Sequence, residues 1–442
     1  MNKEIKKFSP ESIIKNLNID SLNEIQLAAI EAGKLKKDLF LISPTGTGKT
    51  LAFLLALIAR LDQGVKYVQA VILVPTRELA LQIDSVVRQM KTPFSVSCCY
   101  GGHAVQVEKN SLAQSPDIII ATPGRLADHI SRGHVNVERV QTLVLDEFDK
   151  SLEMGFDEEM EYIIGHLKAV SKKILTSATE GDEIPGFVRI NNPVKLKYQT
   201  ESIGSQLLLL KQVQCNDKEK LTCLLKLLCN IGNEPCLVFC NHRDAVERLS
   251  AYLEEKNIIH DYFHGGLEQV DREKTLAKFR NGSTRILIAT DLAARGLDIP
   301  EIKFIIHFQL AMTEDAFVHR NGRTARMKAE GTAILLLNKH ETIPAYINPQ
   351  PEILELKEMP LPSEPEWETL FVGKGKKDKV NKIDLVGFLS KKGQLEQNEI
   401  GLIEVKDYFS YVAVKRNKIK SLIKLVESEK IKGAKAKIQI AR

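Results

Sequence analysis

The 442-residue sequence lacks any uninterrupted run of about 18 uncharged apolar residues, the length that a membrane-spanning helix needs. No apolar core follows the lysines of the first seven residues, so we expect neither a membrane span nor a secretory signal. Cysteine is scarce, with seven residues, and none has the short paired spacing of a zinc site. We therefore expect buried, reduced thiols and a cytoplasmic protein.

The positive charge of the sequence is concentrated at one end. The formal net charge is +5, yet residues 373–442 contain 18 Lys and Arg against 8 Asp and Glu. The rest of the chain has 44 basic and 49 acidic residues. A merely solvated surface would also explain this imbalance. We favour a basic module that holds a polyanion such as a nucleic acid.

Short apolar runs alternate with longer helical patterns through the first two thirds of the chain, which predicts an α/β fold with buried parallel strands. The pattern restarts after residues 200–210, so two similar α/β domains are expected in tandem. The runs are Leu39–Ile42, Ala70–Val74, Ile118–Ile120, Leu143–Leu145 and Lys173–Leu175, then Cys236–Phe239, Arg285–Ile288, Phe304–Ile306 and Ala333–Leu337. Polar motifs follow the carboxyl ends of several runs, where open α/β sheets bind their ligands.

Six prolines between Pro344 and Pro365 predict an extended linker. Beyond it, the patterning predicts strand-helix-strand-strand-helix-strand, the split βαβ order of many RNA-binding domains. Basic side chains of this unit are expected to contact phosphates, namely Lys374, Lys376, Lys377, Lys379, Lys415, Arg416 and Lys418. Tyr408, Phe409 and Tyr411 offer aromatic surfaces, although core packing would equally explain Phe409 and Tyr411.

Two motifs indicate phosphoryl-transfer chemistry. Residues Ser43–Thr50 form a glycine-rich loop with Lys49 and Thr50, which would hold the β- and γ-phosphates and magnesium. The loop is a variant, because Ser43 stands where the generic pattern has glycine. Asp146 and Glu147 follow an apolar run; Asp146 would bind magnesium mostly through water, and Glu147 would orient and deprotonate the attacking water. By itself, such an acidic pair would more often cap a helix.

Further motifs follow in a fixed order. The complete set is Phe8 with Gln26; Ser43–Thr50; Pro75–Ala80; Gly101-Gly102; Thr122–Arg125; Asp146–Asp149; Ser177–Thr179; Gln269 with Arg272; Ala289–Asp291 with Arg295–Asp298; and His319–Arg326. In content and order, this set resembles the motifs of the DEAD-box ATP-dependent RNA helicases. The C-terminal unit, with Gly387–Leu389, Ile400-Gly401 and Ser410–Val414, is similar to the RNA-binding domain of the DbpA-type subgroup.

The resemblance implies two RecA-like domains, residues 1–200 and 206–362, followed by an RRM-like domain, residues 366–442. It also implies the roles of individual residues. Gln26 would read the adenine edge with Phe8 stacked near it, so ATP is expected. The phosphates would contact Thr45, Gly46, Thr47, Gly48, Lys49 and Thr50, and Asp298 would contact the ribose. Arg323 and Arg326 would act as arginine fingers when the cleft closes.

Two further sets of residues follow from the resemblance. Ser177, Thr179 and His319 would couple the carboxylate site to the domain interface. The RNA backbone would contact Arg77, Gly102, Thr122, Arg125, Arg272 and Thr290, which gives affinity without sequence readout. The sequence departs from the family pattern at Phe148, where the family has Ala, and before Gln26, where the usual proline is missing. Asn321 and Ala325 replace Ile and Gly between the arginines, with little expected effect.

We expect ATP-dependent, local unwinding or remodelling of structured RNA by a monomer. Similarity to the DbpA type implies that the RNA is ribosomal and belongs to the assembling large subunit, in a pre-ribosomal particle. A DNA helicase is an alternative, against which the Gln26 element and Ser177–Thr179 argue. A non-catalytic RNA clamp or assembly factor is another, against which the presence of Glu147 and Arg323 argues.

Overall fold

The computed structural model describes residues 10–43, 47–102, 105–177, 184–198, 208–216, 219–291, 302–324 and 331–441. The bulk of the chain up to residue 204 forms one compact unit, and the bulk from residue 205 onward forms another. The expected domain limits at residues 1, 200 and 206 lie outside the described residues.

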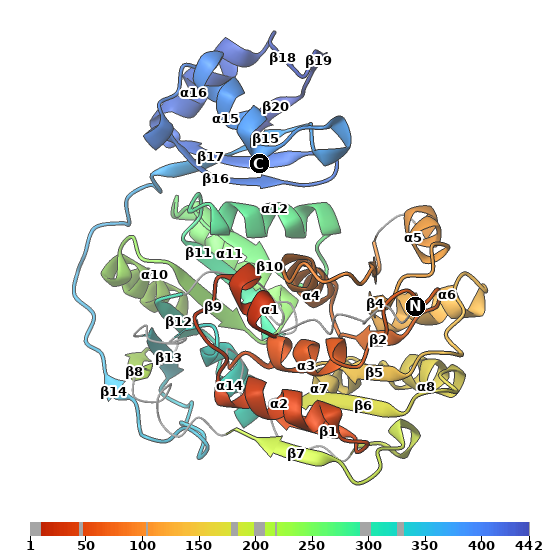
Figure 1. The fold of residues 1–442 in the computed structure, drawn as a ribbon. Helices are drawn as coiled ribbons and strands as arrows, with labels where there is room; N and C mark the ends of the chain where they lie inside the picture. The colour runs from red at the N-terminus through yellow and green to blue at the C-terminus, as the bar shows by residue number, and fades with distance from the viewer. Residues whose placement is uncertain are drawn as a thin grey trace. The chain divides into compact units, whose positions relative to one another are not determined.

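The first unit contains a seven-stranded sheet in the order β3-β4-β2-β5-β6-β1-β7, and every strand pair is parallel (Figure 1). The strands are β1 (Leu39–Ile42), β2 (Ala70–Leu73), β3 (Val96–Cys99), β4 (Ile118–Ala121), β5 (Thr142–Leu145), β6 (Lys172–Ser177) and β7 (Val194–Lys197). The helices are α1 (Pro10–Leu17), α2 (Glu24–Lys34), α3 (Lys49–Ile58), α4 (Arg77–Gln89), α5 (Val105–Leu112), α6 (Pro123–Ser131), α7 (Phe148–Glu153) and α8 (Asp157–His166), with a 3-10 turn at Gly186–Val188. The five strands expected in this part are therefore present.

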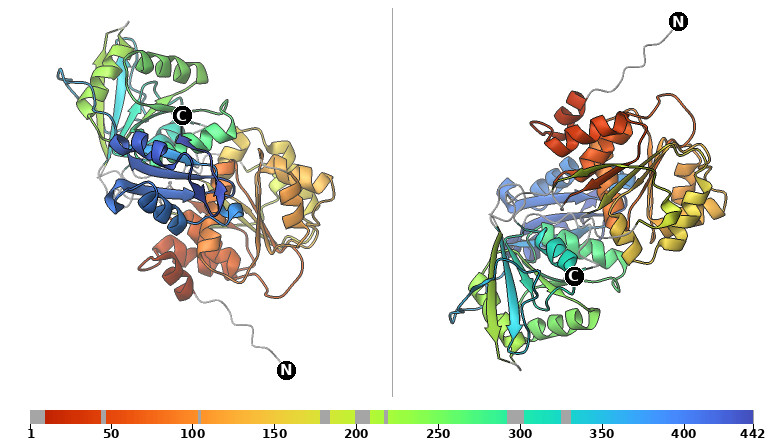
Figure 2. Two further views of the ribbon diagram at one scale, coloured as in Figure 1. Left: turned by 90° about the horizontal axis from the view of Figure 1, so that it is seen from above. Right: turned by 90° about the horizontal axis from the view of Figure 1, so that it is seen from below.

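Both faces of this sheet are buried, which explains why its central strands read as continuous apolar runs. In β1, Leu39 and Leu41 join one core cluster with residues of α2, α3 and α4. Phe40 and Ile42 point to the other side, into a cluster with residues of α6, α7 and α8. The helices accordingly form a layer on each face (Figure 2).

The second unit begins with a similar sheet in the order β10-β11-β9-β12-β13-β8-β14, again with only parallel pairs. Its strands are β8 (Leu208–Cys215), β9 (Cys236–Cys240), β10 (Asp261–Phe263), β11 (Ile286–Thr290), β12 (Phe304–His307), β13 (Gly331–Asn338) and β14 (Glu352–Ile353). Its described helices are α10 (Lys220–Ile231), α11 (Arg243–Glu255), α12 (Gln269–Arg280) and α14 (Glu314–Asn321). The expected pair of parallel α/β sheets is thus confirmed.

The proline-rich stretch after β13 contains no helix and only the two-residue strand β14, which confirms an extended linker. It leads to a four-stranded antiparallel sheet in the order β16-β17-β15-β20. The elements are β15 (Trp367–Val372), α15 (Lys382–Lys391), β16 (Ile400–Val405), β17 (Ser410–Lys415), α16 (Arg416–Val426), β18 (Lys430–Ile431), β19 (Ala434–Lys435) and β20 (Ile438–Ile440), with 3-10 turns at Lys376–Asp378 and Gln397–Glu399. The split βαβ order of the C-terminal domain is therefore confirmed.

One face of this C-terminal sheet carries aromatic side chains, and it packs on α12. Tyr411 is 1% exposed and lies in a cluster with Ala277 of α12, against which Phe371 and Phe409 also pack. The packing explanation is therefore correct for these aromatic residues. Tyr408, in contrast, is exposed.

Several basic residues expected at phosphates have protein partners instead. Arg416 donates to the carboxylate of Glu368 and to the backbone oxygens of Pro365 and Trp367. Lys415 pairs with Glu366. In the same domain, Lys418 pairs with Glu399, and Lys374 with Asp378. Lys376, Lys377 and Lys379 remain exposed in the loop after β15.

All seven cysteines are free thiols, five of them buried and two half-buried, as expected. Burial raises the pKa of the Cys236 and Cys240 thiols to about 12. Among the described residues, no helix combines the length and apolar character needed to cross a membrane.

Candidate functional site

The expected site residues of the first unit lie along one edge of its sheet, because parallel strands all end there. Strand order divides this edge in two. The residues expected at RNA follow β3, β4 and β2, whereas the phosphate loop, the carboxylates and Ser177 follow or end β1, β5 and β6. Strands β2 and β5 are neighbours, so the two groups meet between them. The sheet itself therefore places the residues expected at RNA beside those expected at the nucleotide, and we call these two groups the RNA half and the nucleotide half of the edge.

Lys49 begins α3 directly after the phosphate loop, and it is buried. Its ammonium group donates to the backbone oxygens of Ser43 and, at 3.3 Å, Ser177. Burial lowers the pKa of Lys49, although the nearby carboxyl groups of Glu147, Asp146 and Asp149 act in the opposite direction. A cation so placed, at the start of a helix, is suited to bind a phosphate chain.

Gln26 is connected to the phosphate loop through the start of α2. Asn23 caps this helix, and its side chain also donates to the Thr47 carbonyl at 2.9 Å. Gly48 has φ +87°, and a Cβ there would lie 2.5 Å from the Gln26 amide nitrogen. The positive φ makes this position one that favours glycine. Helix α2, which carries Gln26, is therefore held at the phosphate loop without the usual proline, because Asn23 both caps this helix and contacts Thr47.

Asp146 and Glu147 follow β5 and are held by Thr176 of β6. The Thr176 hydroxyl donates to Asp146 Oδ1 at 2.5 Å and accepts from the Glu147 amide at 3.0 Å. Glu147 has a left-handed backbone with φ 47°, which turns the chain into α7. Burial, together with Glu147, raises the pKa of Asp146 to about 7 despite the Thr176 hydrogen bond. Sequence analysis did not single out Thr176, which precedes the Ser177 motif.

Phe148 and Asp149 begin α7 just after the carboxylates. Phe148 is 3% exposed and lies in the core cluster with Met160 and Leu126, so the larger side chain is absorbed by packing. The Asp149 carboxylate is buried, 3.5 Å from the Lys150 ammonium. The departure from the family's Ala at position 148 therefore leaves Asp146 and Glu147 in place.

The RNA half of the edge contains two arginines at the starts of helices. Arg77 begins α4 and lies over the Tyr100 ring, with its guanidinium carbon 4.5 Å from the ring centre. Arg125, in the first turn of α6, is 3.5 Å from Glu108, whose carboxylate also contacts His129 at 2.7 Å and accepts from the Tyr100 amide at 3.0 Å. Thr122 precedes α6 without capping it through its side chain, and Gly102 has φ +77°. These four residues thus follow three neighbouring strands, β3, β4 and β2, at one edge of the sheet.

In the second unit, the expected residues again follow the carboxyl ends of strands. Thr290 ends β11, Arg272 lies in the first turns of α12 after β10, and both His319 of α14 and Arg323 are buried. The Arg272 guanidinium lies over the Phe263 ring, 5.0 Å from its centre.

Sequence analysis missed the residue that organises this edge of the second sheet, Arg320. It is 1% exposed, and every guanidinium nitrogen has a partner. Two bonds go to the Asp291 carboxylate at 2.5 and 2.8 Å, and others reach the Gln309 carbonyl and Asn241 Oδ1, both at 2.6 Å. The arginine therefore joins the ends of β9, β11 and β12. Its place inside the His319–Arg326 motif was the available signal.

His307 completes this network as a neutral imidazole. Its Nε2–H donates to Asn321 Oδ1 at 3.0 Å, and its Nδ1 accepts from Arg320 at 3.3 Å. Burial and the Arg320 charge lower the pKa of His307 to about 3. The ring is therefore uncharged, with Nδ1 unprotonated, and this allows Arg320 to be buried beside it.

This arrangement predicts a loss of stability in acid. Because the folded pKa lies below the unfolded value of about 6.5, the unfolded chain binds the extra proton, and stability falls as pH drops below about 6.5. The loss should approach 1.4 kcal/mol per pH unit, at most, until the folded pKa is reached. Urea unfolding at pH 7.5 and 5.5 would measure it, with His307→Gln as a control that keeps a donor but cannot titrate. Equal pH dependence in both proteins would contradict the prediction.

Six expected site residues lie outside the described residues, namely Phe8, Thr45, Gly46, Thr179, Asp298 and Arg326.

Known proteins resemble all three parts of the chain. The family model for the DEAD/DEAH box helicase matches residues 23–184, that for the helicase conserved C-terminal domain matches residues 219–328, and that for the DbpA RNA binding domain matches residues 369–440. A relative named ATP-dependent RNA helicase DbpA from Escherichia coli (strain K12) is 33% identical over 98% of this chain and 99% of its own length. A protein of the same name from Bacillus subtilis (strain 168) is 30% identical over 97% and 96%.

Solved structures agree with these relatives. Saccharomyces cerevisiae Dbp5 bound to RNA and ADP BeF3 has a TM-score of 0.66 and 26% identity, over 75% of this chain and 88% of that chain. Mss116p bound to ssRNA and AMP-PNP has a TM-score of 0.65 and 26% identity, over 75% and 73%. Both likenesses cover about three quarters of this chain.

Proposed function

Because this chain belongs to the DEAD-box ATP-dependent RNA helicases and is similar over nearly its full length to relatives of the DbpA type, we propose that it remodels ribosomal RNA of the large subunit. The chain is an ATP-hydrolysing RNA helicase. The finer proposal is that a ribosomal RNA hairpin, bound by the C-terminal domain, brings the helicase to nearby duplexes in a pre-ribosomal particle. We further propose that it acts in the cytoplasm as a monomer.

The proposed chemistry assigns a role to each group of the nucleotide half. Lys49 binds the β- and γ-phosphates, and Glu147 orients the attacking water and takes its proton. Thr176 holds both the Asp146 side chain and the Glu147 backbone, so it fixes the carboxylate pair. Arg323 and Arg326 are proposed to stabilise the charge that develops on the γ-phosphate, and Ser177, Thr179 and His319 to couple the two domains.

The oxygen ligands of the nucleotide half suit a magnesium ion. Asp146 and Thr50 offer only oxygen atoms, which this ion prefers, and the buried Asp146 carboxyl with its raised pKa is a group that a nearby cation would ionise. We propose that these two residues hold it, Asp146 mostly through water. When bound, the ion would neutralise charge on the β- and γ-phosphates.

We propose that ATP turnover depends on RNA because an RNA strand binds to the RNA half of the same sheet edge. Arg77, Gly102, Thr122 and Arg125 would hold one strand by its backbone, with Arg272 and Thr290 of the second domain. Contacts of this kind recognise phosphate and sugar and give no sequence preference. A preference for ribosomal RNA must therefore come from another surface.

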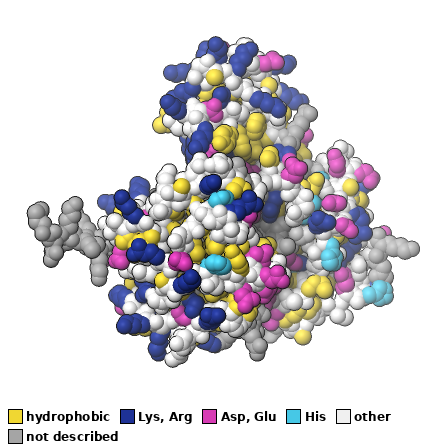
Figure 3. All heavy atoms as spheres, turned by 90° about the vertical axis from the view of Figure 1, so that its right-hand side faces the viewer, with side chains coloured by type: hydrophobic (Ala, Val, Ile, Leu, Met, Phe, Trp, Pro, Cys, Tyr) yellow, Lys and Arg dark blue, Asp and Glu magenta, His cyan; other side chains and the backbone are white. Residues whose placement is uncertain are grey.

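The single observation that supports ribosomal targeting is the basic C-terminal domain that matches the DbpA RNA binding domain. Lys and Arg side chains are spread over its visible face (Figure 3). Its aromatic sheet face is covered by α12, so we place the RNA on the exposed lysines Lys376, Lys377 and Lys379 and on the β18–β19 hairpin. The hairpin adds Lys430, Lys435 and Lys432, which also pairs with Asp384. Lys437 precedes β20, and its carbonyl accepts from the Gly373 amide beside that loop.

Reversing the three loop lysines tests this proposal. The variant Lys376→Glu, Lys377→Glu, Lys379→Glu should retain ATPase activity with excess generic RNA, because the helicase motifs are untouched. Its half-saturating concentration of large-subunit ribosomal RNA should rise about a hundredfold, since the tethered contact is lost. Steady-state ATPase assays with ribosomal RNA, bulk RNA, DNA and no nucleic acid would measure both effects.

The matched control reverses three exposed lysines of the first unit, Lys34, Lys36 and Lys37, and should leave the ribosomal preference unchanged. Deleting residues 366–442 should have the same effect as the loop variant. An undiminished preference for ribosomal RNA in the deleted protein would refute the proposal. Stimulation by DNA would instead support the DNA helicase, and RNA binding without ATP turnover would support the clamp.

A further inference from the structure

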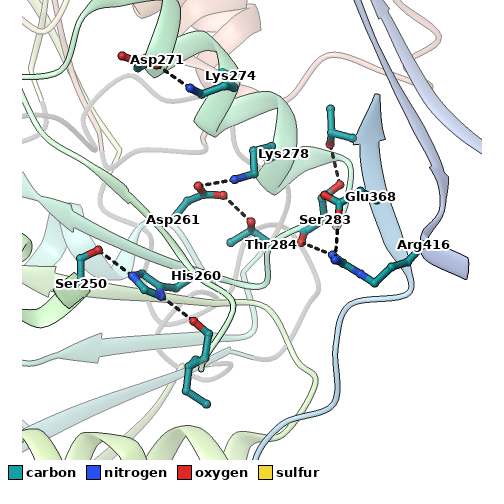
Figure 4. A network of polar contacts seen from close by, with 12 residues as sticks. Ser250, His260, Asp261, Asp271, Lys274, Lys278, Ser283, Thr284, Glu368 and Arg416 are labelled. Carbon is teal, nitrogen blue, oxygen red and sulfur yellow. Dashed lines mark hydrogen bonds and ion pairs between the residues drawn. The ribbon is translucent and has the colours of Figure 1, made fainter. Parts of the chain in front are cut away.

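Helix α12 lies between the parallel sheet of the second helicase domain and the antiparallel sheet of the C-terminal domain. On the helicase side, Lys278 donates to Asp261 of β10 at 2.7 Å, and Thr284 donates to the same carboxylate (Figure 4). Thr275, Leu276 and Phe279 of the helix are buried. The helix is therefore fixed to its own domain by a charged pair as well as by packing.

The opposite side of α12 meets the aromatic face of the C-terminal sheet. Ala277, which is fully buried, lies in one cluster with Tyr411 and Ala441. Phe371, Phe409 and Tyr411 pack on one another with ring centres 5.3 to 6.0 Å apart. A small residue at position 277 allows the helix to approach this aromatic layer closely.

Polar contacts fix the orientation of the two domains. Arg280, the last residue of α12, makes a two-pronged pair with Glu404 of β16, with distances of 2.7 and 2.9 Å. Beyond the helix, the Ser283 hydroxyl lies 2.6 Å from the Thr369 hydroxyl of β15, and Asn281 donates to the same oxygen. Arg416 donates to the Ser283 carbonyl at 3.2 Å (Figure 4). Two-pronged pairs and buried hydroxyl contacts are directional, so they define one docking geometry.

The same helix carries Arg272, a residue expected at the RNA backbone, eight positions before Arg280. At 1.5 Å per residue, the two side chains start about 12 Å apart along the helix axis. Helix α12 thus carries both the surface that contacts the C-terminal domain and Arg272, the residue expected to contact the RNA strand.

We propose that Arg280 and Glu404 are positioning residues that lock the C-terminal domain to α12 and thereby decide which duplex reaches the helicase motifs. This inference rests on the proposed function, because it requires RNA on the C-terminal domain. With the lock closed, RNA held by that domain is presented to Arg272 at a set distance and orientation. With the lock open, only the short segment between Ser363, whose hydroxyl accepts from Asn233, and Trp367 of β15 connects the domain to the second helicase domain. The C-terminal domain can then reorient, and the effective concentration of the correct duplex falls.

Charge reversal tests the lock in the full-length protein. Arg280→Glu and Glu404→Arg each place like charges together, and Glu404→Arg also meets Lys406, which is 2.9 Å from Glu404. The double exchange restores an opposite-charge pair. Non-cysteine spin labels at Glu254 of α11 and Lys424 of α16, both exposed, report the distance between the two domains. We expect a narrow distance distribution in the parent protein and the double exchange, and a broad one in each single variant.

The functional measurement uses ATPase stimulation by large-subunit ribosomal RNA and by a short unstructured RNA. Each single reversal should raise the half-saturating ribosomal RNA concentration about tenfold, leave the value for unstructured RNA unchanged, and be largely rescued by the double exchange. The control Glu234→Arg, which breaks the exposed pair with Lys303, should change neither value.

Two results would overturn the inference. One is a distance distribution that stays narrow in both single variants, because the pair would then not hold the domains. The other is a broadened distribution with unchanged ribosomal RNA dependence, because docking would then not position the substrate. Failure of the proposed function is distinguishable, since deletion of residues 366–442 would then leave the ribosomal preference intact whatever the spin labels report.

Discussion

Replacing Glu147 by Gln should lower the rate of RNA-stimulated ATP hydrolysis by about a thousandfold, within the range that a positioned general base contributes. The amide has the shape of the carboxylate but cannot take a proton from the attacking water. Thr176 would still hold the Glu147 backbone and the Asp146 side chain, since neither contact uses the Glu147 side chain. ATP binding and ATP-dependent retention of RNA should therefore persist.

Single-turnover hydrolysis, together with RNA retention in the presence of ATP, would measure both halves of this result. Glu158→Gln, an exposed carboxylate at the start of α8, is the matched control and should hydrolyse ATP at the parent rate. Hydrolysis that continues undiminished in Glu147→Gln would remove Glu147 from its proposed role. Loss of ATP binding in that variant would show that the side chain holds the nucleotide instead.

The second large effect is expected for Lys49→Ala, which should weaken ATP binding by at least about a hundredfold. Charge-assisted hydrogen bonds are worth about 1.5–3 kcal/mol each, and the ammonium would make more than one to the phosphates. The change also removes a cation that interacts with Asp146 and Glu147, so the anionic nucleotide would meet carboxylates that are less well compensated.

Binding of a fluorescent ATP analogue would measure the loss, and thermal unfolding would show whether the first domain remains folded. Lys168→Ala, at an exposed pair with Glu138, provides the control. Parent-level ATP affinity in a folded Lys49→Ala protein would argue against the phosphate-loop assignment. Unfolding of the variant would be separated from loss of binding by Lys49→Met, which keeps the apolar stem and removes the charge.

The sequence predicted the central strands of both parallel sheets because these strands are buried on both faces and read as continuous apolar runs. It missed β3, β7 and β10, which lie at sheet edges and mix polar with apolar residues. Strand β8 was also missed, since Lys211, Gln212 and Gln214 interrupt its apolar character. Edge strands carry a weaker pattern because only part of their surface is buried.

The separate members of the site followed from motifs, but the residues that hold them did not. Thr176 and Arg320 act through contacts with residues 30 and 29 positions away along the chain. The packing of α12 on Phe371 and Tyr411 joins two surfaces that lie about 90 or more residues apart along the chain and belong to different domains. Such pairings have no local periodicity, and a single sequence therefore does not reveal them.

The parallel arrangement of β2 and β5 has a consequence for how this protein can change over evolutionary time. The Asp146 amide donates to the Leu73 carbonyl, so Asp146, the proposed magnesium ligand, and the strand that leads to Arg77 are neighbours in one ladder. Their separation is about 4.8 Å, a repeat imposed by the sheet and independent of loop length. Insertions in the connecting segments can therefore change which RNA is bound, while the spacing between the strand that ends at Asp146 and the strand that leads to Arg77 stays constant.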